Sequence, residues 1–314
     1  MVYIGIDVGG TGIQVGVVDE GGHILHRGAI VTRTDIPYQD QIKAMADCVL
    51  ETLAQNNVPL SDVKSIGVGV PGIAIPRTGV VPFCNNLGWH DVPFIDEFRK
   101  HIDKPVFVDN DATVAGLAEY VAGVSAGTDS SVFITLGTGV GGGIIIHGKA
   151  WSGFHGVGSE IGHITMDLDG ESCNCGNRGC LERYCSATAI INMARKAMAD
   201  HPESSIMALC GGDVSRINAK MVFDAAREGD ATAGAIFQRY VSYLAQAINT
   251  IICFLDPEII VLGGGVSKAG DFLLDAVRRE LPRYILFKSM PYARIELAQL
   301  GPDAGIIGAA MLGQ

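Results

Sequence analysis

The chain opens with short apolar segments that alternate with glycine-rich turns. Residues 3–6 and 13–18 are apolar, and the turn between them is Asp7-Val8-Gly9-Gly10-Thr11. A second turn, at residues 19–22, leads to a third expected strand at residues 23–27. Short apolar runs separated by turn residues are typical of neighbouring antiparallel strands. The pattern predicts a three-stranded antiparallel meander.

A helical period follows the meander. Over residues 39–55, apolar side chains recur at helical spacing and predict one buried face, made of Ile42, Met45, Ala46, Val49, Leu50 and Leu53. Strands separated by helices predict an α/β domain. In chain order, the further expected elements are a strand at 65–70, a long loop at 82–93, a helix at 96–101, a strand at 106–108 and a helix at 112–120.

The strand–turn–strand pattern recurs in the middle of the chain. Val132-Phe133-Ile134-Thr135 precedes a second glycine turn, and Ile144-Ile145-Ile146 follows it. Two copies of one unit, one per domain, would face each other across a cleft. In this plan the chain resembles the actin/hexokinase-like ATPase fold, whose α/β domains are duplicated and ribonuclease H-like. We expect a smaller domain at residues 1–112 plus about 302–314, and a larger one at 113–301.

Composition excludes several classes of protein. The length of 314 residues suggests two domains, and the net charge of −11 argues against binding to nucleic acid or to an anionic membrane. The start of the chain lacks the pattern of a secretory signal, and no apolar stretch is long enough for a membrane helix. A cytoplasmic location is expected, where cysteines stay reduced and a cysteine cluster indicates a metal site.

The second glycine turn fits the dinucleotide-binding pattern G-x-G-x-x-G, but three isoleucines follow it, so a strand is expected where that fold has a helix. The alternatives are an ordinary hairpin turn or a hairpin tip whose N–H groups bind phosphate, and two such loops at equivalent positions favour the second. Asp7 suits a water-mediated Mg²⁺ contact. The candidate phosphate-binding residues are Gly9, Gly10, Thr11, Gly137, Thr138, Gly139 and Gly141.

Asp111 follows the strand predicted at 106–108 and stands at the start of the next helix. A carboxylate in this place serves as an N-cap. It is equally suited to accept a proton from a substrate hydroxyl during phosphoryl transfer. The two roles are compatible, and the local pattern leaves both open.

Three cysteines lie close together after a histidine. His163, Cys173, Cys175 and Cys180 offer one nitrogen and three sulfur donors, which suit a tetrahedral structural Zn²⁺. Free thiols in a loop are the alternative. Cys185 could compete as a ligand, although a helix is expected to carry it away. The remaining cysteines lie singly among apolar residues and are expected in the core: Cys48, Cys84, Cys210 and Cys253.

Taken together, these segments resemble the ROK family of bacterial sugar kinases and related repressors, and most closely its ATP-dependent glucokinases. The matching pieces keep the family's order and cover nearly the whole chain. They are Asp7-Val8-Gly9-Gly10-Thr11, Gly69-Val70-Pro71-Gly72, Asn86-Leu87-Gly88-Trp89, Asn110-Asp111-Ala112, Leu136-Gly137-Thr138-Gly139-Val140-Gly141-Gly142-Gly143, Gly158-Ser159-Glu160-Ile161-Gly162-His163, Cys180-Leu181-Glu182, Leu262-Gly263-Gly264-Gly265-Val266 and Asp303-Ala304-Gly305.

The resemblance implies an ATP:sugar phosphotransferase of carbohydrate metabolism and glycolysis, with ATP, Mg²⁺ and structural Zn²⁺, acting on the 6-hydroxyl of glucose. Asp111 would be the base, and His163 would bind zinc through one ring nitrogen and sugar through the other. A homodimer is expected. The sugar would be held by Asn110, Asp111, Glu160, His163 and Glu182, and adenosine would lie against Gly263, Gly264 and Gly265. A plain strand-to-helix turn explains these last glycines equally well.

Three alternatives remain beside this interpretation. The acceptor could be another sugar, such as mannose, N-acetylmannosamine, N-acetylglucosamine, fructose or allose, since these differ by single contacts. The loop Cys84-Asn85-Asn86 departs from the common family form and bears on that choice. A sugar-responsive repressor would need a DNA-binding segment and a basic surface, and neither is expected here. An actin-like ATPase would not explain the cysteine–histidine signature.

Overall fold

The computed structural model describes all 314 residues, and the chain divides into two compact units. Unit 1 consists of Met1–Phe133, Gly143–Ser159 and Ala298–Gln314, and unit 2 of Ile134–Gly142 and Glu160–Leu297. The domain boundaries expected from the sequence stay a prediction. No helix is both long enough and apolar enough to cross a membrane.

Unit 1 contains a five-stranded sheet with the order β3-β2-β1-β4-β8. The first three strands pair antiparallel, which confirms the predicted meander, and β4 pairs in parallel with both β1 and β8. Alternating and fully buried apolar positions in these strands supply one face of the core. The strands are β1 (Val2–Val8), β2 (Gly12–Val18), β3 (Ile24–Val31), β4 (Val63–Val70) and β8 (Val106–Asn110).

Helix α1 (Tyr38–Gln55) packs against β2 and β3, and α2 (Phe94–Arg99) against β8. The predicted buried face of α1 is confirmed at Ile42, Met45, Ala46, Val49 and Leu53, but wrong at Leu50, which is 38% exposed. Leu50 follows Val49 directly, so it turns away from the line that faces the sheet.

The loop predicted at residues 82–93 is wrong. These residues take part in a three-stranded antiparallel sheet made of β5 (Ile73–Ile75), β6 (Val80–Cys84) and β7 (Trp89–Val92). Prolines at both ends of the segment suggested a loop, but the single turn η2 (Asn85–Leu87) between β6 and β7 makes a hairpin, in which Phe83 pairs with His90.

The second sheet has the order β11-β10-β9-β12-β13. Strands β9 and β10 flank the second glycine turn, and each contributes residues to both units. The strand expected after this turn is confirmed. The strands are β9 (Ser130–Leu136), β10 (Val140–Ile146), β11 (Lys149–Ala150), β12 (Ile259–Gly263) and β13 (Arg294–Leu297).

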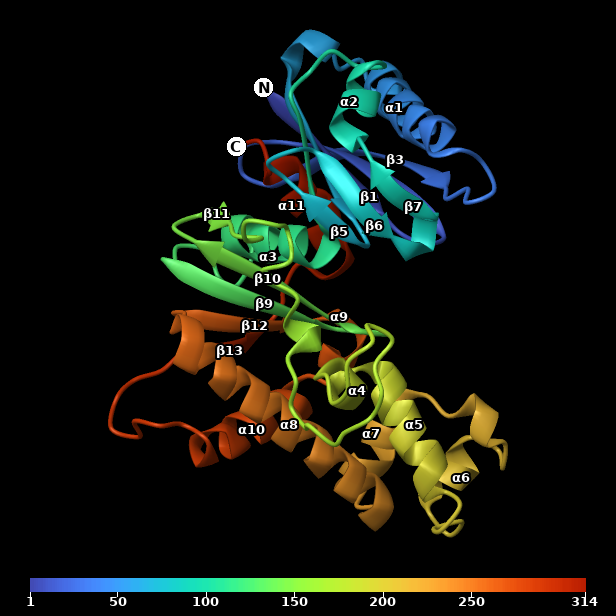
Figure 1. Cartoon of the computed structure of the whole chain (residues 1–314), viewed down its shortest axis with the longest axis vertical. Helices are drawn as coiled ribbons and strands as arrows, with labels where there is room; N and C mark the ends of the chain where they lie inside the picture. Colours follow the sequence, from blue (N-terminus) through green and yellow to red (C-terminus); the bar gives the residue numbers. More distant parts are fainter. The chain divides into compact units, whose positions relative to one another are not determined.

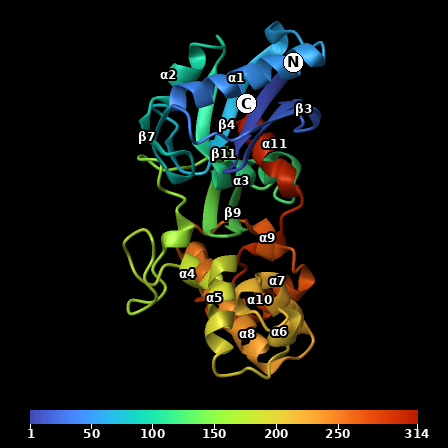
Figure 2. The same cartoon turned by 90° about the vertical axis from the view of Figure 1, so that its right-hand side faces the viewer.

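Most of unit 2 is helical, and Figure 2 shows its longer helices gathered together. Helix α8 packs against α5, α7 and α10. The helices are α4 (Glu182–Cys185), α5 (Ala187–Ala197), α6 (Ser205–Leu209), α7 (Ala219–Arg227), α8 (Ala231–Leu255), α9 (Gly264–Ser267) and α10 (Asp271–Glu280). Single 3₁₀ turns in the chain are η1 (Leu60–Asp62), η3 (Ile161–His163), η4 (Val214–Arg216), η5 (Leu281–Arg283) and η6 (Gly301–Asp303).

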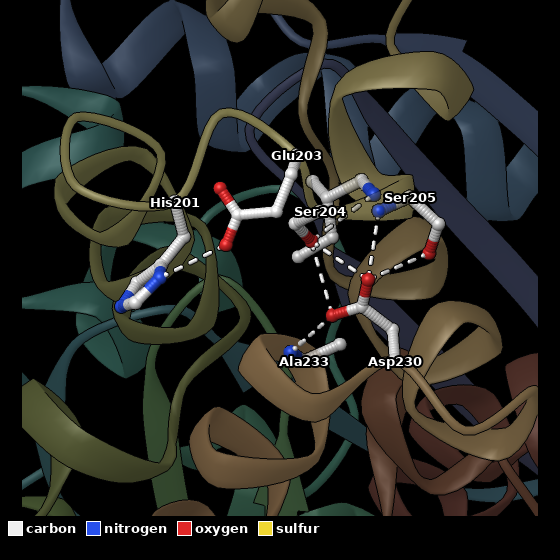
Figure 3. Close-up of polar contacts among 7 residues, drawn as sticks. His201, Glu203, Ser204, Ser205, Asp230 and Ala233 are labelled. Atoms are coloured by element: carbon white, nitrogen blue, oxygen red, sulfur yellow. Dashed lines mark hydrogen bonds and ion pairs between the residues drawn. The ribbon is translucent and has the colours of Figure 1, made fainter.

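One carboxylate ties the starts of two of these helices together (Figure 3). Asp230 caps α8 by accepting the N–H of Ala233 at 2.8 Å, and it also accepts the N–H of Ser205 at 2.7 Å and the hydroxyl of Ser204 at 3.0 Å. Burial alone would raise the pKa of Asp230, but these hydrogen bonds outweigh it and lower the pKa. The neighbouring contact between His201 and Glu203, also drawn there, is exposed.

The C-terminal helix α11 (Ala304–Met311) belongs to unit 1, where it packs on β1, β4 and α3 (Asp111–Ala122). Figure 1 shows α11 beside α3. Glycines make this contact possible. A Cβ on Gly5 would overlap the carbonyl of Ile306, one on Gly67 the carbonyl of Ala309, and one on Gly308 the carbonyl of Val114. Backbone therefore lies directly on backbone along this helix.

Two helical glycines give a matched test of this packing. Gly308→Ala in α11 should destabilise the protein by about 1–3 kcal/mol or more, because its methyl group has no space. Gly234→Ala in α8 meets no atom within 4 Å and should instead stabilise by about 0.5–1 kcal/mol through helix propensity. Thermal and urea unfolding of both variants measures this. Equal effects of the two substitutions would contradict the packing argument.

Candidate active site and metal centre

The acid singled out in the sequence begins helix α3, directly after β8. The N-cap, however, is Asn110, whose side-chain oxygen accepts the N–H of Ala112 at 2.9 Å and of Thr113 at 3.3 Å. The prediction that Asp111 is the N-cap is therefore wrong, because Asn110 has the extended backbone that a cap requires and Asp111 is already helical. Asp111 is exposed, and it accepts the N–H of Ala112 at 2.8 Å.

Asn110 has a second contact that fixes its side chain. Its amide donates to the carbonyl of Gly72 at 3.0 Å, so both ends of the amide are used within unit 1. The strand end and the helix start are thereby held in one geometry, and the Asp111 carboxylate projects from the first turn of α3. The positive end of the helix dipole favours an ionised carboxylate there.

A buried acid lies two residues before Asp111. The Asp109 side chain is 2% exposed and accepts the hydroxyl of Ser152 at 2.8 Å and the N–H of Asn110 at 2.8 Å. Burial raises the pKa of Asp109 to about 6, although both hydrogen bonds oppose the rise. Sequence reasoning missed this pair, since Ser152 is distant in the chain and carries no local signal.

The first glycine turn lies at the end of β1. Gly9 closes it by donating its N–H to the carbonyl of Gly12 at 2.9 Å, and Gly10 and Thr11 are exposed at its tip. Asp7 is partly buried, and its carboxylate lies against Gly305 in the first turn of α11, where a Cβ would not fit. Burial raises the pKa of Asp7.

The second glycine turn belongs to unit 2, and a side chain from a later segment of the chain binds its backbone. Gly137 donates its N–H to the carbonyl of Gly139 at 3.0 Å, and Thr138 is exposed. The N–H of Val140 donates to the Glu182 carboxylate at 3.0 Å. Gly141, next in β10, is partly buried. Glu182, expected as a sugar ligand, therefore also supports this turn, a contact that the sequence did not indicate.

The predicted metal ligands come together. The ligand atoms of His163, Cys173, Cys175 and Cys180 all lie within 4.8 Å of one another. Zinc–ligand bonds of about 2.0–2.3 Å in a tetrahedron place ligand atoms roughly 3.3–3.8 Å apart. The sulfurs of Cys175 and Cys180 are 3.6 Å apart, and Cys173 Sγ lies 3.8 Å from His163 Nδ1, so the donor set fits a zinc ion.

The other cysteines lie outside this cluster. Cys185 is buried and its thiol donates to the carbonyl of Tyr240 at 3.7 Å, which agrees with its exclusion. Cys48, Cys84 and Cys210 are buried as predicted. The core position predicted for Cys253 is wrong, because this residue is exposed near the end of α8.

His163 has a separate neighbour for each ring nitrogen. Nδ1 faces Cys173, and Nε2 lies 3.9 Å from the carboxylate of Glu160. Burial raises the pKa of the Glu160 carboxyl, because its charged form is removed from water. The ring can thus bind a metal on one side and a polar ligand on the other.

Gly263, Gly264 and Gly265 form a turn from β12 into α9, as expected for either interpretation of them. Gly264 has a φ of +86°, and a Cβ there would overlap the backbone of Leu136, so only glycine fits. A cavity of about 430 Å³ lies beside the turn within unit 2. Its lining includes Ala187, Asn218, Lys220, Phe223, Arg227 and Gly265, none of which except Gly265 the sequence had indicated.

Comparison with known proteins decides the family, because the ROK family profile matches residues 3–314. The chain belongs to the ROK family. It is 39% identical to a glucokinase of Thermotoga maritima, over 98% of this chain and 96% of that one. It is 33% identical to an N-acetylmannosamine kinase of Yersinia pestis, over 98% and 97%.

A solved structure supports the fold directly. The ROK glucokinase of Streptomyces griseus, in complex with glucose and AMPPNP, matches 99% of both chains with a TM-score of 0.82 at 35% identity. The ROK hexokinase of Thermus thermophilus matches 100% of this chain and 97% of its own, with a TM-score of 0.82 at 30% identity. The predicted two-domain α/β kinase fold is therefore confirmed.

The buried Asp109 predicts a pH effect on stability. Its folded pKa of about 6 lies above its unfolded value of about 3.9, so its contribution is complete below pH 4 and is lost as the pH rises to 6. The stability of wild type relative to Asp109→Asn should therefore fall by about 2–3 kcal/mol between pH 4 and pH 7.

Urea unfolding at several pH values measures this difference. Ser152→Ala removes a hydrogen bond to the ionised Asp109 carboxylate and so raises its folded pKa further. In that variant the decrease in stability should therefore continue to higher pH. Parallel pH profiles for wild type and Asp109→Asn would show that Asp109 does not titrate in this range.

Proposed function

We propose that this protein is an ATP-dependent glucokinase that phosphorylates the 6-hydroxyl of glucose. The observation that carries the proposal is the arrangement at the start of α3, where Asn110 supplies the cap and the exposed Asp111 is not needed for it. Similarity to glucokinases over nearly the whole chain, including one solved with glucose and AMPPNP, supports the choice of substrate.

In the proposed reaction, Asp111 accepts the proton of the sugar 6-hydroxyl. The oxygen attacks the γ-phosphorus, and the bond from phosphorus to the bridging oxygen of ADP breaks. Asn110, Glu160, His163 and Glu182 bind the sugar hydroxyls, since carboxylates, amides and imidazole each pair with hydroxyl groups. Glucose 6-phosphate and ADP leave as products, which is an entry step of glycolysis.

The nucleotide would be bound by residues of the two glycine turns and of the cavity beside Gly265. The phosphates would meet the N–H groups and hydroxyls of Gly9, Gly10, Thr11, Gly137, Thr138, Gly139 and Gly141. The adenosine would occupy the cavity beside Gly263, Gly264 and Gly265. Mg²⁺, held through water by Asp7, would neutralise charge on the phosphates.

A structural Zn²⁺ on His163, Cys173, Cys175 and Cys180 completes the proposal. It would fix the orientation of the His163 ring toward the sugar. A cytoplasmic location suits the four ligands, because thiols stay reduced there. We also propose a homodimer, in keeping with the family resemblance. N-acetylmannosamine is the second candidate acceptor, since a kinase for it is 33% identical to this chain.

Replacing the base gives the main test of function. Asp111→Ala should lower kcat by about 10²–10⁴-fold, because the base is removed, and it should still bind glucose through the other proposed sugar ligands. The matched control is Asp103→Ala, an exposed acid on the loop before β8, which should behave as wild type. Coupled ADP-release assays on glucose and on the five other sugars named above measure both activity and preference. An Asp111→Ala enzyme with a tenth of the wild-type kcat would exclude this base.

The metal gives a second test. Purified protein should contain about one zinc per chain, and Cys173→Ser should lose it and raise the KM for sugar by about 10–100-fold, more than the KM for ATP. Cys253→Ser, outside the cluster, should keep both zinc and KM values. Elemental analysis and steady-state kinetics measure this. Native protein without zinc would refute the site, and equal losses for both substrates in folded protein would refute its link to the sugar.

A further inference from the structure

A fully buried carboxylate in unit 1 is hydrogen-bonded by backbone N–H groups and not by a cationic side chain. Glu119 of α3 is 0% exposed, and Oε1 accepts the N–H groups of Gln299 at 2.8 Å and Leu300 at 2.9 Å. Oε2 accepts the N–H of Val124 at 3.0 Å. Gly123 makes room for it, since a Cβ there would overlap Oε2. A buried charge is tolerated only when it is fully hydrogen-bonded, and these three donors meet that need.

The segment that Glu119 holds leads directly to the C-terminal helix. Gln299 and Leu300 follow β13, and the carbonyl of Leu300 accepts the N–H of Asp303 in the turn η6. Helix α11 begins at the next residue, Ala304. The Glu119 carboxylate therefore determines where the backbone stands immediately before α11.

The first helical turn of α11 contacts Asp7, the acid at the start of the first glycine turn. Gly305 lies so close to the Asp7 carboxylate that a Cβ on it would contact Cγ and both carboxylate oxygens. On the outer side, Asp303 is paired with Arg27 of β3 at 2.7 Å. A shift of residues 299–303 would carry Gly305 with it and change the space that Asp7 occupies.

We propose that Glu119 is a positioning residue for Asp7, acting through Gln299, Leu300 and the first turn of α11. The proposal rests on the role of Asp7 in the proposed nucleotide site. Glu119 touches no substrate, so its loss should affect Mg·ATP and leave sugar binding unchanged. A purely structural role would instead lower stability without distinguishing the two substrates.

The test is a double-mutant cycle of Glu119→Ala with Asp7→Asn. Glu119→Ala should raise the Kd for Mg·ATP about 10–100-fold, as loss of support behind a metal contact does, with the KM for glucose unchanged. In the Asp7→Asn background, Glu119→Ala should raise the Kd for Mg·ATP little further, because the carboxylate that Glu119 positions is already replaced. Calorimetry with Mg·ATP and steady-state kinetics on the full chain supply the values.

Two further variants keep the test decisive. Glu119→Gln retains one oxygen for Gln299 and Leu300 and loses the acceptor for Val124, so it should bind Mg·ATP nearly as wild type does while melting lower. Val49→Ala removes buried apolar volume from α1 and should lower stability with no change in either substrate constant.

The outcomes separate the two proposals. If the effects of the two substitutions on the Kd for Mg·ATP add in the double mutant, the positioning role is overturned while wild type remains a glucokinase. The same holds if folded Glu119→Gln and Glu119→Ala bind Mg·ATP and glucose more weakly by equal factors. Wild type that binds Mg·ATP without phosphorylating glucose would overturn the glucokinase proposal, and the cycle is then read from Kd alone. Wild type that does not bind Mg·ATP would overturn both.

Discussion

The close packing of α11 on glycine backbone is the constraint on which the rest of unit 1 depends. Gly5 of β1, Gly67 of β4 and Gly308 of α11 each remove a side chain where two backbones meet. The helix thus contacts the sheet and α3 at once. Asp7 lies on β1 and Asp111 begins α3, so the acid proposed to hold Mg²⁺ and the acid proposed as the base are both carried by elements that pack on this one helix. Packing that tolerates no added methyl group transmits small shifts efficiently.

Local signals explain what the sequence could predict. The meander, the helix α1 and the cysteine–histidine cluster depend on residues close together in the chain, where strand and helix periods and ligand spacing operate. Local signals also fail where two neighbours suit one role. Asn110 and Asp111 are equally good N-caps by residue type, and only the backbone of Asn110 decides between them. Leu50 was misplaced for a similar reason, since it adjoins the buried Val49.

Contacts across long sequence separations could not be predicted. Glu119 reaches Gln299, which is 180 positions away, and Asp109 reaches Ser152, which is 43 away. The residues around either acid do not predict its partner, because only the folded chain brings the two together. A sequence containing an acid within an apolar helix or strand does indicate that a buried partner must exist, since an unpaired charge would be too costly there. It does not indicate whether that partner is a cation, a hydroxyl or the backbone.

In unit 2 the cysteine–histidine cluster and the second glycine turn are linked by hydrogen bonds from one short segment. Glu182 begins α4 two residues after Cys180, and its carboxylate accepts the N–H of Val140 at the end of the turn. From the helix that follows, Ala187 donates to the carbonyl of Gly137 and Thr188 to that of Thr138. Both sides of the turn are therefore held by one short stretch of chain that starts at Cys180, one of the proposed metal ligands. An ion that ordered Cys180 would thereby also steady Glu182, a proposed sugar ligand, and through its carboxylate the backbone of the turn.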